Sequence, residues 1–461
     1  MGYTKCKMLR KDFRAHRKFF FISTLILFLS FSFNLFGAVS TEAFLRNFKD
    51  SESLITNQII CRGQPYAGQL LEAKDATKGN VQTKCDPTGL KPYSSQYGLQ
   101  GKVYTAGYII ATKVTHMRPL IYVALAQLLT ALASAACLAL IALWARARFG
   151  RIPAITLVLL VSISPMIVGF ARNLYWALPL LLLPIVYVLY GFPSAKNNKG
   201  KLLFWALLAV LLYIRFLCGY EYITTITFMV AALVAYHLYM QKSTVGTYIR
   251  QMTIVGIVAV MSFAAALGTH IVSLNGYTGS TKQSITIIKQ RAIERTTNSK
   301  DYLSYPYKGL KFTLGDFYST ADSYFMLDNQ SDDQSEVIST LVSYVNYALL
   351  PVVTSPVTLN QPFGSYIESL TMFVGILGGL FYTRHKWCKE IAIRDLNAMY
   401  LAALIGLAGY ISWLVLAHSH SLVHPHINGI LMYLPFALFG YLIVGVFIQS
   451  MTRKVILRYK R

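Results

Sequence analysis

Two acidic residues in a short polar stretch, Asp50 and Glu52, are the first candidates for chemistry in this chain. They lie about ten residues beyond the first long apolar run, in the string Lys49-Asp50-Ser51-Glu52. A carboxylate close to a membrane can serve as a general base that takes the proton from an acceptor hydroxyl. Two residues of separation put the side chains on different faces of a helix, or on the same side of an extended strand. The competing interpretation is a solvated turn without a chemical role.

Further candidates lie in two short connections between apolar runs. Arg172 and Tyr175 belong to the first connection, and Arg215 and Glu221 to the second. Charges at such positions cost free energy unless they are solvated or paired, so they are candidates for function. Arg172 can bind a phosphate through its planar guanidinium, or it can extend from a helix end to lipid headgroups. Glu221, flanked by two tyrosines, is either a second catalytic acid or the structural partner of Arg215.

A histidine-rich segment precedes the last apolar run. Its H-x-H-x(3)-H-x-H spacing could bind zinc, but no matched carboxylate or cysteine signature accompanies it. Hydrogen bonding to a phosphate or a sugar is one alternative, and a plain polar helix end is the other. We expect no cofactor, and no metal is indicated. The candidate substrate-binding residues of this segment are His418, His420, His424, His426 and Asn428.

The composition indicates which elements position these residues. Hydrophobic residues make up 55% of the 461 residues and charged residues 13%, against about 25% charged in ordinary globular proteins. Many apolar runs approach or exceed the ~20 residues that a helix needs to cross a ~30 Å hydrocarbon core. We therefore predict an all-α polytopic membrane protein with a single integral-membrane domain over residues 1–461.

We predict about ten transmembrane helices, which places both termini on one side of the membrane. The net charge of +24 does not indicate nucleic acid, because the basic residues recur in every second connection between apolar runs. By the positive-inside rule these connections and both termini are cytoplasmic. The basic N-terminus and the first run are interpreted as a retained signal anchor. The predicted spans are 19–40, 119–144, 152–170, 174–191, 202–218, 222–240, 252–273, 366–383, 397–417 and 428–449.

The first of two large extracytoplasmic loops covers residues 41–118. A juxtamembrane helix around Phe44 is expected at its start, and its middle, 62–96, is rich in Gly, Pro, Ser, Lys and Asp and is expected to be irregular. Cys61 and Cys85 share this loop. A disulfide between them is expected if the compartment is oxidising.

The second large outer loop covers residues 274–365. It contains an apolar run at 337–356 that is interrupted by Asn346. A full transmembrane span there would reverse the side of every later connection, against the charge pattern. We therefore expect a re-entrant or surface helix at this place.

In this layout the chain resembles the GT-C class of integral-membrane glycosyltransferases. The resemblance covers the order of spans and loops over most of the chain. In that class an acid of the first outer loop is the catalytic base, and the donor is usually a polyprenyl-phosphate or polyprenyl-pyrophosphate sugar. Many members carry an acidic pair directly after the first span, where this chain has Thr41-Glu42. The resemblance implies Asp50 as the base, with Glu52 as its substitute and Glu42 as a further possibility. Four local strings carry the resemblance as well: Asp50-Ser51-Glu52, Tyr93-Ser94-Ser95-Gln96-Tyr97-Gly98-Leu99-Gln100-Gly101, Arg172-Asn173-Leu174-Tyr175-Trp176 and Gly219-Tyr220-Glu221-Tyr222.

The implied activity is inverting transfer of a sugar to a cell-surface glycan, such as the O-antigen of lipopolysaccharide. The implied place is the periplasmic face of a bacterial inner membrane, with the lipid bilayer, the polyprenyl-phosphate sugar and the acceptor glycan as partners. An O-antigen polymerase or ligase is the nearest alternative. His418-Ser419 followed by Gly429 begins the ligase pattern, but Met432 does not fit its last position. A transporter or flippase of lipid-linked sugars suits the number of spans, but would need ionisable residues deep within helices.

Overall fold

The computed structural model describes residues 7–39, 44, 49–62, 70–73, 84–195, 197–296, 370–388, 390–417 and 425–459. Regular structure in these ranges is helical, apart from one pair of three-residue strands. The predicted juxtamembrane helix, except Phe44, and the predicted helix at 337–356 lie outside the described residues.

Seven segments in the described part of the chain are long and apolar enough to cross a membrane. This confirms a polytopic helical membrane protein, while the number of ten spans stays a prediction. Two shorter apolar helices, α6 (Arg151–Ser162) and α8 (Leu178–Gly191), lie among them. The seven are provided by α1 (Lys7–Phe33), α5 (Pro119–Phe149), α9 (Asn198–Cys218), α10 (Ile223–Met240), α11 (Val245–Thr278), α16 (Glu390–Leu416) and the run Gly429–Leu457.

Prolines interrupt two of the predicted spans. Residues 152–170 form α6 and a separate short helix, α7 (Pro165–Phe170), because Pro165 has no N–H to continue the ladder and favours an extended residue before it. The last predicted span is divided at Pro435, into α18 (Pro425–Met432), the π-helical η3 (Tyr433–Ala437) and α19 (Leu438–Tyr459). The predicted span 366–383 corresponds to α15 (Leu370–Trp387).

Helix α5 is a long helix with several packing partners in the bundle. It packs against α1, α6 and α8, while α10 packs against α16 and α9 against α11. Alanines on α5, among them Ala131, Ala135 and Ala142, are completely buried. Such small side chains let helix backbones approach closely in a membrane, where packing replaces the hydrophobic effect as the main attraction between helices.

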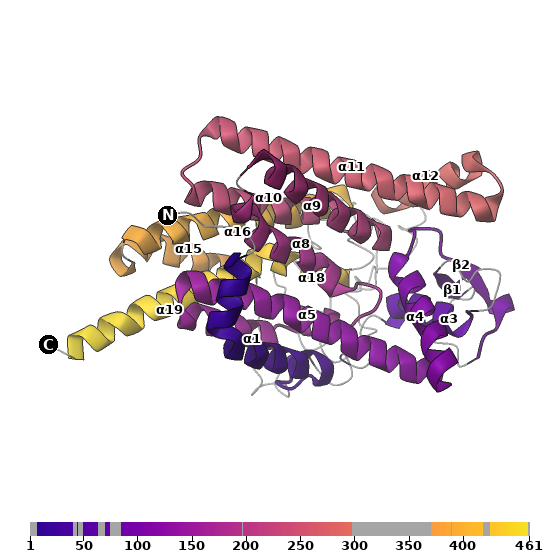
Figure 1. The fold of residues 1–461 in the computed structure, drawn as a ribbon, viewed down its shortest axis with the longest axis horizontal. Coiled ribbons are helices and arrows are strands. Elements are labelled where there is room, and N and C mark those ends of the chain that lie inside the picture. Colours follow the sequence, from indigo (N-terminus) through magenta and orange to yellow (C-terminus); the bar gives the residue numbers. More distant parts are fainter. Residues whose placement is uncertain are drawn as a thin grey trace, which may run out of the picture.

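A small lobe lies at one end of the bundle, at the right of Figure 1. It consists of α3 (Lys49–Ile60), the antiparallel strands β1 (Leu71–Ala73) and β2 (Leu90–Pro92), the 3-10 turn η1 (Pro87–Gly89) and α4 (Leu99–Thr115). The prediction of an irregular middle was therefore wrong for the two strands, and α4 was not predicted. We call this end of the bundle the lobe end.

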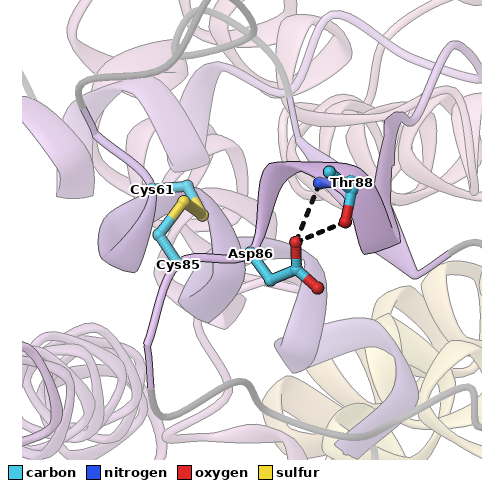
Figure 2. The surroundings of a disulfide bond; sticks show 4 residues. All are labelled: Cys61, Cys85, Asp86 and Thr88. Carbon is cyan, nitrogen blue, oxygen red and sulfur yellow. Dashed lines mark hydrogen bonds between the residues drawn. A yellow bond between two sulfur atoms is a disulfide. The ribbon is translucent and has the colours of Figure 1, made fainter.

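A disulfide joins the end of α3 to the segment before β2. Cys61 and Cys85 form this bond with a Cα–Cα distance of 5.0 Å, as expected for an oxidising compartment. Figure 2 shows the adjacent turn, in which an Asp86 carboxylate oxygen accepts hydrogen bonds from the Thr88 backbone N–H at 3.0 Å and the Thr88 hydroxyl at 2.6 Å. The disulfide thus ties the segment before β2 to the end of α3.

The opposite end of the bundle, which we call the basic end, contains the C-termini of α5 and α10 and the N-termini of α9, α11 and α16. Arg148 on α5 forms an ion pair with Asp395 on α16, with 2.7 Å between its Nη2 and Oδ1. Arg394 donates hydrogen bonds to the carbonyls of Tyr239 and Met240 at the end of α10. Two arginines thus tie three helices together at this end.

Candidate functional site

Four segments that are far apart in the sequence meet at the lobe end of the bundle. They are the start of α3, the turn that leads into α4, the Arg172–Trp176 turn between α7 and α8, and the Gly219–Tyr222 turn between α9 and α10. The Arg172–Trp176 turn connects the others through its backbone and side chains. We call this arrangement the lobe-end site.

Glu52 is the carboxylate that α3 contributes to the site. Its Oε1 accepts a hydrogen bond from the Leu174 backbone N–H at 3.0 Å, and its Oε2 accepts one from Gln127 Nε2 of α5 at 2.9 Å. The side chain is half-buried. Burial raises the pKa of Glu52 above its ordinary value of 4.5, although the two hydrogen bonds and the charge of Arg172 oppose the rise. The result is a fixed carboxylate with a stronger proton affinity than a free one.

Arg172 provides a cation beside this carboxylate. Its guanidinium lies over the ring of Phe44, 3.9 Å from the centroid, and Nη2 donates to the Phe44 carbonyl. Burial lowers the pKa of Arg172 and the charge of Glu52 raises it again. An arginine still stays protonated under such conditions. The remaining N–H groups of its planar fork suit a phosphate or a carboxylate.

Tyr175 connects the turn that binds Glu52 to a second carboxylate, that of Glu221. Its hydroxyl lies 3.2 Å from Gln96 Oε1 and 3.5 Å from Glu221 Oε1, the latter at the outer limit of a hydrogen bond. Its carbonyl accepts a hydrogen bond from Gln100 Nε2 at 2.9 Å. The turn that holds Glu52 through Leu174 therefore also contacts Glu221 and the entry to α4 through Tyr175.

Gly219 lies so close to these side chains that it has no room for a β-carbon. An added Cβ would be 2.4 Å from Glu221 Oε2 and 2.6 Å from Gln96 Oε1. The two acceptors, each about 3% exposed, are thus packed against the backbone of the turn. On the far side of the turn, the Tyr220 hydroxyl lies 2.9 Å from His270 Nδ1 on α11 and fixes the chain there.

The backbone is strained at the two edges of the site. Tyr222 has φ +72° and Ala177 has φ +44°, left-handed values that cost non-glycine residues about 1–3 kcal/mol. Aromatic packing holds the first of them, because the Tyr222 ring stacks on Trp176 with 5.3 Å between centroids and meets Trp413 edge-on at 5.0 Å. Strain of this kind is typical of places where a fold fixes functional side chains.

Arg215 approaches the site from the last turn of α9. Its side chain is 2% exposed and contacts the Cys218 thiol. Arg215 and Glu221 share Tyr222 as an electrostatic neighbour. The guanidinium therefore adds a buried positive charge to the same end of α9 from which the Glu221 turn begins.

Several buried polar atoms in this region have no hydrogen-bond partner among the described residues. Buried donors and acceptors are almost always satisfied in proteins, so each such atom is a candidate contact for a polar ligand. They include three donors and one acceptor, on two of the four segments and at the end of α9. The atoms are Gln96 Nε2, Gln100 Oε1, Trp176 Nε1 and Arg215 Nε.

Of the predicted site residues, Glu52, Arg172, Tyr175, Arg215 and Glu221 come together in this way. Residue 50 belongs to the first turn of α3, and the Asp50 side chain lies outside the described residues. His418, His420 and His424 lie outside them too, and for His426 and Asn428 only the helical backbone is described.

Three glutamines of the site were not predicted as functional. Gln96 and Gln100 lie within a string that carried the resemblance, whereas Gln127 lies inside an apolar run of α5, where an amide is unusual enough to have been a signal. Among the described residues no group of three His, Cys, Asp or Glu side chains is placed to hold a metal ion.

No protein family, curated protein or solved structure matches this chain.

Proposed function

We propose that the chain is a membrane glycosyltransferase that moves a sugar from a polyprenyl-phosphate donor to a hydroxyl of a cell-surface glycan. The observation that supports this proposal is the meeting of the four strings that resemble the GT-C class. Each of them contributes a polar contact to the lobe-end site, and the Arg172–Trp176 turn links them.

Glu52 is the base in this proposal, in place of Asp50. Both of its oxygens already accept one hydrogen bond, from Leu174 and Gln127, and each keeps a second lone pair for an acceptor hydroxyl. A raised pKa brings the carboxylate closer to the operating pH, which suits a general base. The two hydrogen bonds fix its position before the substrate binds.

Arg172 takes the phosphate of the donor. The acceptor hydroxyl gives its proton to Glu52 and its oxygen bonds to the anomeric carbon, while the bond from that carbon to the phosphate oxygen breaks on the opposite face. The electron pair leaves with the polyprenyl phosphate, whose charge the guanidinium stabilises. Glu221, Tyr175 and Gln96 are placed to bind sugar hydroxyls beside this reaction.

The lobe end is the extracytoplasmic side in this proposal. The Cys61–Cys85 disulfide favours an oxidising compartment for the lobe. The arginines and lysines at the opposite end favour the cytoplasm for that end. A bacterial inner membrane with its active site toward the periplasm satisfies both.

Mass spectrometry of surface glycans from cells with the gene, without it and with Glu52→Gln tests the proposal. Glu72→Gln is the matched control, since Glu72 lies in the same lobe but pairs with Lys91 at 3.9 Å, away from the site. We expect the glycan to lose the mass of one sugar in the null and in Glu52→Gln, and to keep it in Glu72→Gln. Loss of the whole polymer in the null would indicate a polymerase, a ligase or a flippase instead, and an unchanged glycan in Glu52→Gln would remove Glu52 from the reaction.

A further inference from the structure

A cavity of about 620 Å³ lies at the basic end of the bundle, at the other end of the helices from the lobe-end site. Its walls come from the C-termini of α5 and α10, the N-termini of α9 and α11, and the 3-10 turn η2 (Phe192–Ser194). Neither the candidate residues of the sequence nor the proposed sugar transfer uses it.

Its charged lining is entirely basic. Arg148, Lys201 and Arg250 face the cavity, and no Asp or Glu is among its described lining residues. Arg148 is neutralised by its ion pair with Asp395. Lys201 and Arg250 form no ion pair within the described part of the chain and are exposed. Two uncompensated positive charges therefore converge on one cavity.

A buried polar side chain adds a contact between these charges. His237 lines the cavity and is only 7% exposed, and its Nε2 has no hydrogen-bond partner among the described residues. Its ring is held by stacking on Phe192, with 5.7 Å between centroids. Such a nitrogen needs a polar partner: as N–H it donates to a phosphate oxygen, and as a lone pair it accepts from a headgroup hydroxyl.

The surroundings of the two cations are apolar. Phe204 and Trp205 form part of the wall, with ring centroids 4.9 Å apart. Beside Lys201, Leu202 is 73% and Leu203 60% exposed, and beside Arg250, Ile249 is 63% exposed. A ligand with an anionic head and hydrocarbon chains matches both kinds of surface, whereas a free phosphate would leave the apolar part unused.

We propose that this cavity binds the phosphate headgroup of an anionic phospholipid. Its phosphate lies between Lys201 and Arg250 within reach of His237, and its acyl chains follow the exposed apolar faces of α9 and α11. Basic cavities between transmembrane helices on the cytoplasmic side are suited to such headgroups. This site is independent of the sugar transfer proposed for the lobe end.

Native mass spectrometry of the full-length protein in detergent tests the site, with titration of phosphatidylglycerol and of phosphatidylethanolamine with the same acyl chains. The test variant is Lys201→Gln/Arg250→Gln. The control is Lys199→Gln/Lys242→Gln, which removes the same charge at the same end from two exposed residues outside the cavity lining. We expect phosphatidylglycerol to bind the test variant about 30-fold more weakly than the wild type, since each basic residue near an anionic lipid contributes about fivefold. The control should retain its affinity.

Three results would overturn the proposal. The first is an equal loss of affinity in the control variant, which would mean a diffuse attraction of the basic face. The second is equally tight binding of phosphatidylethanolamine. The third is saturation by millimolar inorganic phosphate with no preference for the lipid, which would identify a free anion as the occupant. If the double variant does not purify as a folded protein, the two single variants carry the same test, each with about a fivefold loss expected.

Discussion

Replacing Gly219 by alanine tests the packing of the lobe-end site at its tightest point. The residue has φ 172°, an extended conformation that alanine adopts without strain, so the effect is purely steric. The added Cβ would lie 2.4 Å from Glu221 Oε2 and 2.6 Å from Gln96 Oε1. To reach an ordinary contact of 3.4 Å, the two oxygens must retreat by about 1.0 Å (3.4 − 2.4) and 0.8 Å (3.4 − 2.6).

Such shifts break the contacts of the Tyr175 hydroxyl, which are already 3.2 and 3.5 Å long. Overpacking of this kind costs about 1–3 kcal/mol of folding stability. A displacement of about 1 Å at a reacting centre lowers the rate by roughly 100-fold. We therefore expect Gly219→Ala to lower the unfolding temperature modestly and to abolish most of the sugar transfer.

Thermal unfolding in detergent and glycan mass spectrometry would measure the two effects. Gly256→Ala on α11 is the control, because an added Cβ there meets nothing within 4 Å and alanine is the better helix former by about 0.5–1 kcal/mol. Shortening the acid in Gly219→Ala/Glu221→Asp should restore part of the lost stability. If Gly219→Ala were as stable and as active as Gly256→Ala, the close approach, and with it the proposed geometry of the site, would be refuted.

Three further predictions concern the same end of the molecule. Tyr175→Phe removes the hydroxyl that contacts Gln96 and Glu221 and should cost about 1–3 kcal/mol in thermal unfolding. Tyr382→Phe, at a residue 86% exposed, should cost nothing measurable. The pKa of Glu52 is raised on folding, so the folded state binds the proton more tightly than the unfolded state does. The free energy of unfolding should therefore fall as the pH increases from 4.5 through the raised pKa, and Glu52→Gln should flatten this part of the stability–pH profile. The same profile in the variant and the wild type would contradict the prediction. Cys61→Ser removes a cross-link between residues 24 positions apart and should lower the free energy of unfolding by about 3 kcal/mol, measured as faster proteolysis of the lobe. Peptide mapping of the wild-type protein should show a linked Cys61–Cys85 peptide, and two free thiols there would contradict the disulfide.

The helices could be predicted from the sequence because a membrane imposes a strong and local requirement. Each predicted span contains a helix, since about 20 apolar residues have no other way to satisfy their backbone in lipid. The interruptions at Pro165 and Pro435 were missed, although proline gives the physical reason for both. Counting apolar residues gives the length of a hydrophobic run, but it does not reveal a break of the helix within that run.

The site was predictable only in part, because its contacts depend on tertiary structure. The charge pattern placed the turns of Arg172 and Glu221 on one side of the membrane, which is the condition for their meeting. It could not choose between Asp50 and Glu52, since the choice depends on the rotation of α3 against Leu174 and Gln127.

Gln96, in the turn before α4, and Gln100, in its first turn, were missed for a related reason. Gly98 precedes and Gly101 follows the start of this helix, and Leu70 lies so close to both that an added Cβ would be 2.7 Å and 2.5 Å from its side chain. This packing joins residues some 30 positions apart, and the local sequence does not reveal it.

The most direct test of the central claim, that Glu52 takes the proton in a sugar transfer from a lipid donor, uses the purified protein in proteoliposomes. Lipids extracted from cells that lack the gene should contain the unused donor, and mass spectrometry would follow its conversion to free polyprenyl phosphate when the acceptor glycan is added. We predict conversion by the wild type and by Glu72→Gln, and none by Glu52→Gln even though that variant is folded. Conversion by Glu52→Gln at the wild-type rate, or no loss of any lipid-linked sugar with the wild type, would contradict the claim.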